Sequence, residues 1–146
     1  ARAGRDAASI TAAPQILCHV TSAGPEVGEA ERRMRAHMAY YIGGMGSYYH
    51  NLFRRYGYLA ETGAIRMAWA EGRREKAAAL ISDDMLEKIT IFGDAETCRA
   101  KLEQFRRHGA DMPVIAFPHG ISPAAVRRTL EALAPAKVAA PSESPP

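Results

Sequence analysis

Apolar residues in this chain recur mainly at three- and four-residue intervals, which predicts that most of it forms amphipathic helices. The longest predicted helix begins at Pro25 and stops at Gly43 and Gly44. Its apolar face consists of Val27, Ala30, Met34, Met38 and Tyr41. Shorter helices are predicted over residues 47–56, 60–71 and 76–81.

Three later helix starts carry capping signals. Ser82 precedes the acidic turn DDMLEKI, Asp94 precedes a helix that Gly109 ends, and Ser122 is followed by proline. The inner faces predicted for the last two helices are Ala95, Cys98, Leu102 and Phe105, then Val126, Leu130 and Leu133.

Only two segments have the length and composition of buried strands, namely residues 15–21 (QILCHVT) and 112–117. Residues 89–92 are interpreted as a short apolar link. Two parallel strands cannot bury both faces of a sheet. The chain is therefore expected to be the C-terminal part of a larger α/β domain.

The helical stretch between the two predicted strands is too long for a single crossover, and an insertion between two strands of a (β/α)8 barrel would explain it. We accordingly predict an α/β fold, mostly helical, that supplies two parallel strands of a TIM barrel with a long helical insertion. Residues 1–134 form this barrel portion. Residues 135–146, rich in Ala, Pro and Ser, are predicted to be a disordered tail.

The charge and composition limit the partners and the compartment that we expect for this chain. The net charge of +3 comes with five Arg-Arg pairs that fall on different predicted helices, so we expect solvated helix faces and no nucleic-acid partner. Residues 1–13 resemble neither a signal peptide nor a membrane span. The two cysteines have no CxxC spacing, and a cytoplasmic protein is expected.

Familiar catalytic motifs are absent from the sequence. It contains no Gly-x-Ser-x-Gly, no Walker loop and no His-Glu-x-x-His. His37, His50 and His108 have no ligand partner at i+4, and no metal site is predicted.

Three motifs carry a family resemblance: Tyr-x-Gly-Gly-Met-Gly at residues 41–46, Arg-Tyr-Gly-Tyr at 55–58, and Gly-Asp-x-Glu at 93–96 before an amphipathic helix. In this order and spacing, residues 40–65 and 81–111 resemble the C-terminal region of luciferase-like monooxygenases, in particular the branch that uses a deazaflavin.

The resemblance implies a TIM barrel that binds FMN or the 8-hydroxy-5-deazaflavin coenzyme. It implies hydride transfer to, or monooxygenation of, a small organic substrate, and also a homodimer. In this family the main cofactor contacts lie on earlier strands, so the segment alone is expected to be inactive and to bind cofactor weakly.

Barrel active sites lie at the carboxyl ends of the strands, which directs attention to residues 19–22. Leu17, His19 and Thr21 share the more polar face of the first strand, where Thr21 could line a substrate pocket. His19 is the candidate catalytic residue, as a proton donor or a hydrogen-bond partner for substrate. The alternative is a core histidine that a backbone carbonyl satisfies.

The second strand end leads into His119, Gly120 and Ser122, where free N–H groups at a helix start attract anions. These residues are candidates for binding a cofactor phosphate. The alternative is an ordinary turn with a capping serine.

Tyr40, Tyr41, Gly43 and Gly44 are candidates for the substrate pocket, because glycine lets a backbone approach a ligand closely. A plain helix end explains the same glycines. The other aromatic side chains at helical spacing are expected to pack in the core: Tyr48, Tyr49, Phe53, Tyr56 and Trp69.

A different reading is a non-catalytic helical interaction module, in which helix faces between Pro25 and Tyr56 bind a partner protein. A degenerate remnant without activity is the third possibility.

Overall fold

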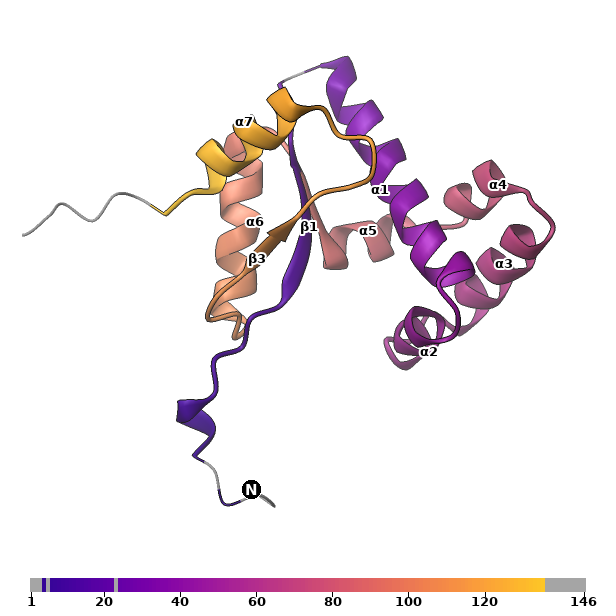
Figure 1. The fold of residues 1–146 in the computed structure, drawn as a ribbon, viewed down its shortest axis with the longest axis horizontal. Helices are drawn as coiled ribbons and strands as arrows, with labels where there is room; N and C mark the ends of the chain where they lie inside the picture. Colours follow the sequence, from indigo (N-terminus) through magenta and orange to yellow (C-terminus); the bar gives the residue numbers. More distant parts are fainter. Residues whose placement is uncertain (1–3, 5, 23, 136–146) are drawn as a thin grey trace, which may run out of the picture.

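The computed structural model describes residues 4, 6–22 and 24–135 and shows a mixed α/β arrangement that is mostly helical (Figure 1). One parallel sheet consists of β1 (Gln15–Val20), β2 (Thr90–Gly93) and β3 (Val114–Ala116). After a 3-10 helix at Ala7–Ser9, the helices are α1 (Pro25–Gly44), α2 (Tyr48–Arg55), α3 (Leu59–Ala70), α4 (Arg74–Ala79), α5 (Asp83–Ile89), α6 (Ala95–Arg107) and α7 (Pro123–Leu133).

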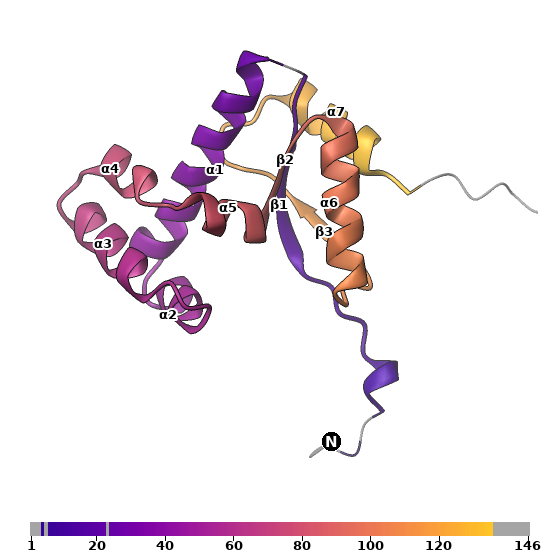
Figure 2. The ribbon, with the colours of Figure 1, turned by 180° about the vertical axis from the view of Figure 1, so that it is seen from behind.

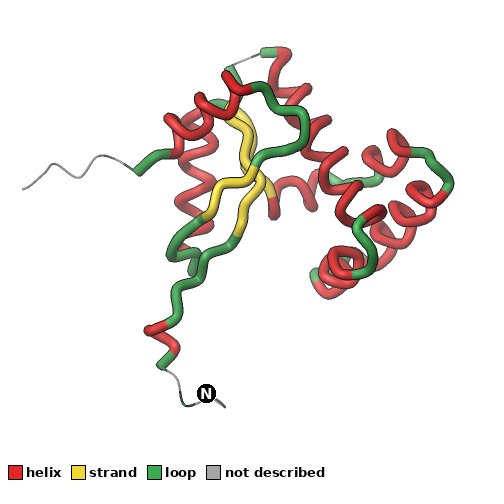
Figure 3. The backbone as a smooth tube through the Cα atoms, in the orientation of Figure 1, coloured by secondary structure: helices red, strands yellow, loops and turns green. Residues whose placement is uncertain are grey.

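The first strand occupies the centre of the sheet, whose order is β2-β1-β3 (Figure 3). Cys18 lies beside Ile91 of β2, and Ile16 lies beside Ile115 of β3. The two predicted strands are thus confirmed as parallel neighbours, although β3 is shorter than the predicted residues 112–117. In the described sheet β2 and β3 each pair with β1 alone.

The prediction of only two strands is wrong, because the supposed link at residues 89–92 contains a third. β2 follows α5 without a turn, and the Thr90 hydroxyl closes that helix by donating to the Leu86 carbonyl at 2.8 Å. Four residues carry too little pattern to identify a strand. Pairing with β1, distant in the sequence, is what makes this segment one.

The strand order differs from that of consecutive barrel strands, which are neighbours in the order of the chain. Here β3 pairs with β1 rather than with β2, an order typical of an open, doubly wound sheet with helices on both faces. Gln15, Ile16 and Leu17 of β1 pair with β3, and Leu17 to Val20 pair with β2.

Helices cover both faces of the sheet (Figures 1 and 2). On one face, α6 and α7 pack over an apolar cluster that includes Ile16, Cys18, Val20, Ile91, Cys98 and Leu102. On the other face, Leu17 and Phe92 contact the cluster formed by α1 to α5. The C-terminal half of α1 continues beyond the sheet and forms a helical lobe with α2, α3 and α4 (Figure 1).

The predicted caps are confirmed. Ser82, Asp94 and Ser122 have extended backbone conformations, and their side chains accept the N–H groups of Met85, Thr97 and Ala125. An N-cap hydrogen bond stabilises a helix by about 1 kcal/mol. These local signals therefore fix where α5, α6 and α7 begin.

The predicted inner face of α7 is partly wrong. Leu133 is buried, but Leu130 is 49% exposed, and the other buried residues are Ala125 and Thr129. The face is rotated because the Thr129 hydroxyl accepts the Val20 N–H at 2.9 Å, which turns a polar residue toward the sheet.

The expectation that the aromatic side chains pack in the core holds only in part. Phe53 is buried and Tyr49 and Trp69 are half-buried, but Tyr48 and Tyr56 are exposed on α2 and just after it. The predicted tail at residues 135–146 lies outside the described residues, apart from Pro135.

Candidate functional site

The carboxyl ends of the three parallel strands meet at one edge of the sheet, as in other α/β folds that bind ligands there. The N–H of Thr21, just after β1, donates to the Gly93 carbonyl at the end of β2 over 2.7 Å. Residues 117–122 continue from the end of β3 to the start of α7. The candidate residues His19, Thr21 and His119 lie on or just after these strand ends.

His19 is buried, and neither of its ring nitrogens has a hydrogen-bond partner. The carbonyl partner expected for a core histidine is therefore not present. Burial lowers the pKa of His19, the Glu26 carboxylate partly opposes this, and Arg128 adds to it. A neutral imidazole offers one donor and one acceptor, and neither is used within the described part of the chain.

Thr21 adds a third unpartnered polar atom on the same face of the strand. Its hydroxyl oxygen is buried and makes no hydrogen bond. A buried polar atom without a partner costs about 1–3 kcal/mol, and such atoms are rare in native proteins. The unpartnered side chains of His19 and Thr21 therefore lower the stability of the fold, and hydrogen bonds from a ligand group would offset that cost.

A charged network fixes the end of β1 to α1 and α7. Arg128 donates from Nε to the Val20 carbonyl at 3.0 Å and pairs with Glu26, which also accepts from the Ser22 hydroxyl. This hydrogen bond from Ser22 lowers the pKa of Glu26, and the pairing with Arg128 lowers it further. This network was not predicted, and its only local signal in the sequence is the four-residue spacing of Ser22 and Glu26.

Four aromatic rings meet where residues 117–122 reach α1, and we call them the four-ring cluster: His37, Tyr40, Tyr41 and His119. His37 stacks on Tyr41 with ring centroids 4.7 Å apart, and the His119 ring lies edge-on to His37 at 4.6 Å. Tyr40 lies 5.5 Å from Tyr41 and 5.6 Å from His119. The structure thus brings Tyr40, Tyr41 and His119 together, and their roles in substrate and cofactor binding stay predictions.

His37 is the member of this cluster that was not among the predicted site residues. Its side chain shares a helix face with Tyr40 at i+3 and Tyr41 at i+4, so helical spacing could have identified it. The His119 N–H donates to His37 Nδ1 at 3.4 Å. Burial, followed by the nearby His119, lowers the pKa of His37 to about 4.

Gly43 and Gly44 lie in the last turn of α1, away from His19, and pack against Trp69 of α3. A Cβ atom on Gly43 would lie 2.6 Å from the Trp69 Cβ, and one on Gly44 would lie 2.8 Å from its Nε1. The structure therefore gives these glycines a packing role: they let α1 and α3 approach closely. Their role in a substrate pocket stays a prediction.

The loop at Gly120 and Ser122 is held by α1 and by its own helix. Arg33 donates to the Gly120 carbonyl at 2.6 Å, and the Ser122 hydroxyl accepts the Ala125 N–H at 3.2 Å. The serine thus has the capping role that was the alternative reading. Phosphate binding at this loop stays a prediction.

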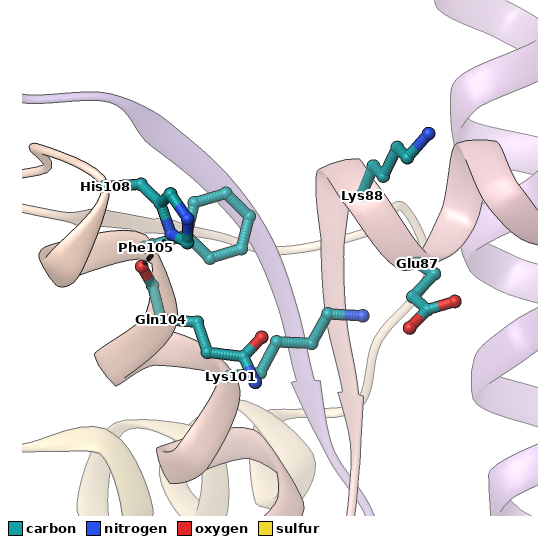
Figure 4. Close-up of a pocket in the computed structure, with 6 residues that line it drawn as sticks. All are labelled: Glu87, Lys88, Lys101, Gln104, Phe105 and His108. Carbon is teal, nitrogen blue, oxygen red and sulfur yellow. Dashed lines mark hydrogen bonds between the residues drawn. The ribbon is translucent and has the colours of Figure 1, made fainter.

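Two pockets lie away from His19 and from the four-ring cluster. One of about 480 Å³ lies between α5 and α6 and is lined by Glu87, Lys88, Lys101, Gln104, Phe105 and His108 (Figure 4). Lys88 and Phe105 also line a pocket with Gln15, at the amino end of β1. These cavities therefore belong to the opposite end of the sheet from His19.

The described ranges contain no group of three His, Cys, Asp or Glu side chains that could hold a metal ion. No helix among them is long and apolar enough to cross a membrane.

Comparison with known proteins gives the family. A Mycobacterium tuberculosis protein that carries the provisional name coenzyme F420-dependent oxidoreductase is 26% identical over 119 residues, which is 79% of this chain. The chain spans about a third of the length of that relative, since the match covers 33% of it. No solved structure matches. Residues 1–112 match the family described as luciferase-like monooxygenase, and the chain belongs to that family.

Proposed function

We propose that this chain is the C-terminal part of a flavin- or deazaflavin-dependent oxidoreductase, which transfers a hydride to, or oxygenates, a small organic substrate. Membership of the luciferase-like monooxygenase family and the similarity to a protein named for coenzyme F420 support this class. The observation that carries the proposal is the pair of buried, unpartnered polar side chains, His19 and Thr21, at a strand's carboxyl end.

The residues present fit part of a bound cofactor and substrate. Neutral His19 can hold or pass one proton at either ring nitrogen, and Thr21 can donate or accept one hydrogen bond. The cofactor, when bound, supplies the hydride chemistry. Ser122 is used as a cap and Arg33 is engaged with Gly120, so most cofactor contacts are proposed to come from residues outside this chain.

The proposal includes a complete (β/α)8 barrel in the longer protein. Closing that barrel requires β3 to change its pairing partner. In a (β/α)8 barrel β3 pairs with β2, whereas here it pairs with β1. Gln15 and Val114 are register partners in the described sheet. A Gln15→Cys, Val114→Cys variant should therefore form a disulfide in the 146-residue chain and fail to form it in the longer protein that completes the barrel.

The two buried cysteines are free. Reduced thiols fit the cytoplasm as the compartment of this enzyme, which remains part of the proposal.

Replacing His19 with Gln in the longer protein tests the function. If His19 donates a proton in the reaction, turnover of the reduced coenzyme should fall by about a hundredfold, with coenzyme affinity nearly unchanged. The matched control is His108→Gln, which removes an exposed histidine just after α6 and should leave turnover unchanged. Unchanged turnover and unchanged substrate affinity in His19→Gln would remove His19 from the site.

A second candidate function is an interaction surface on the helical lobe. Large apolar side chains are exposed on α2, α3 and the turns beside them: Met45, Tyr48, Tyr56, Leu59 and Met67. Exposed patches of this kind mark protein interfaces, including the homodimer that the family resemblance implies. Sedimentation of Leu59→Glu beside the unmodified chain tests it, since equal masses for both would reject this surface as a dimer contact.

A further inference from the structure

The four-ring cluster presents aromatic faces and a hydrogen-bond donor at the same place. His37 Nδ1 accepts the His119 backbone N–H, so a neutral His37 carries its proton on Nε2. The lowered pKa keeps this ring neutral at pH 7. Within the described part of the chain, Nε2 has no hydrogen-bond acceptor. One N–H therefore remains available beside the stacked rings.

The arginine that reaches the loop beside the cluster is already engaged. Arg33 donates to the Gly120 carbonyl and pairs with Glu29. No group of three metal-binding side chains occurs in the described residues. A ligand here would meet the neutral imidazole of His37 with its one N–H donor and the two tyrosine rings with their hydroxyls.

We propose that the four-ring cluster binds an uncharged, planar conjugated ring bearing a carbonyl oxygen, with that oxygen accepting a hydrogen bond from His37 Nε2. Aromatic rings stack on planar ligands with offset or edge-on geometry, as they already do among themselves here. The cluster adjoins the loop that leaves the carboxyl end of β3, where α/β folds bind ligands. That the ring is the substrate rests on the proposed function, whereas the binding itself does not.

Trp69 provides the readout, because it is the single tryptophan of the chain and its ring lies 5.8 Å from Tyr40. Duroquinone, a planar quinone that quenches tryptophan emission, is titrated into the complete 146-residue chain. Durene is the planar tetramethylbenzene of the same size, which lacks the carbonyls, and it competes with duroquinone where stacking alone suffices. The expected result is saturable quenching, with durene competing more weakly.

Two variants separate stacking from the hydrogen bond. His119→Ala removes an exposed ring of the cluster and should weaken the binding of both compounds by about three- to tenfold. His37→Phe keeps a stacked ring but removes the donor, so duroquinone should lose a similar factor while durene is unaffected. Tyr56→Ala, an exposed ring outside the cluster, is the control and should change neither.

Non-saturating quenching, or equal duroquinone affinity in His37→Phe and the unmodified chain, would overturn the proposal. Circular dichroism of each variant shows whether a loss of binding reflects unfolding; His119→Ala provides a low-risk case because its side chain is exposed. Binding without turnover in the longer protein would remove the proposed function and leave this site intact. Turnover by the longer protein without binding at the cluster would reject this site and leave the proposed function intact.

Discussion

The two faces of the three-stranded sheet bury side chains of different character. Under α6 and α7, β1 contributes Ile16, Cys18 and Val20 to an apolar cluster. On the opposite face lie His19 of β1 and Thr21 just after it, which leave three polar atoms without partners. Buried apolar area stabilises a fold, whereas unpartnered polar atoms lower its stability. The first face therefore holds the chain together, and the second gives up stability in the way functional sites do.

The largest effect is expected when apolar volume is removed from the face under α6 and α7. Ile91→Ala should lower the free energy of unfolding by about 2–5 kcal/mol, because Ile91 is fully buried in that cluster. Urea denaturation measures the change. Leu130→Ala, half-exposed on α7, should stay within about 0.5 kcal/mol of the unmodified chain. Equal losses in both variants would mean that this face is not the core.

Two buried threonines allow a matched test of the faces. Thr129 accepts the Val20 N–H and donates to the Ala125 carbonyl at 2.8 Å, so Thr129→Val should destabilise by about 1–3 kcal/mol. The hydroxyl of Thr21 has no partner, so Thr21→Val should leave stability unchanged or raise it by up to about 1 kcal/mol. Urea midpoints of the two variants should move in opposite directions or differ clearly in size. A larger loss in Thr21→Val would reverse the comparison.

The smallest expected effect is the contribution of His19, on the polar face, to the pH dependence of stability. The pKa of His19 is lowered in the folded chain, chiefly by burial, from the usual value of about 6.5. Below about pH 6.5 the unfolded chain therefore binds more protons, and stability falls as the pH decreases. His19→Leu should make this fall shallower by less than about 1 kcal/mol per pH unit.

Urea midpoints at about pH 7.5 and about pH 5.5 measure that slope. His108→Leu serves as the control, because His108 is exposed on the last turn beyond α6. If His19→Leu and the unmodified chain have the same slope, His19 is not held in its neutral form by burial.

The sequence predicted the helices well and the sheet less well, for a physical reason. Ser82, Asp94 and Ser122 start their helices through bonds to residues three positions away, so a local pattern contains the signal. β2 becomes a strand through pairing with β1, whose register partners lie about seventy positions earlier in the sequence. The order of the strands and the rotation of α7 toward Val20 are likewise non-local.

The residues of the candidate site show the same difference between local sequence signals and contacts that are distant in the sequence. His19 and Thr21 were identified from strand alternation, and the structure puts both on one buried face. The contact of His119 with His37 joins residues 82 positions apart, so no local pattern predicts it. The Gly43 and Gly44 pair was noticed, but the reason for it, the Trp69 ring, lies on another helix.

The outer sides of β2 and β3 have a practical consequence for handling the chain. In the described sheet each strand has a neighbour on one side only, and exposed strand edges of this kind recruit other chains and promote aggregation. Pro113 directly precedes β3 and removes one backbone donor, a common protection of such edges, whereas β2 contains no proline. The residues of β2 are buried or half-buried, whereas Val114 of β3 is 43% exposed, so self-association at high concentration is expected to begin at β3.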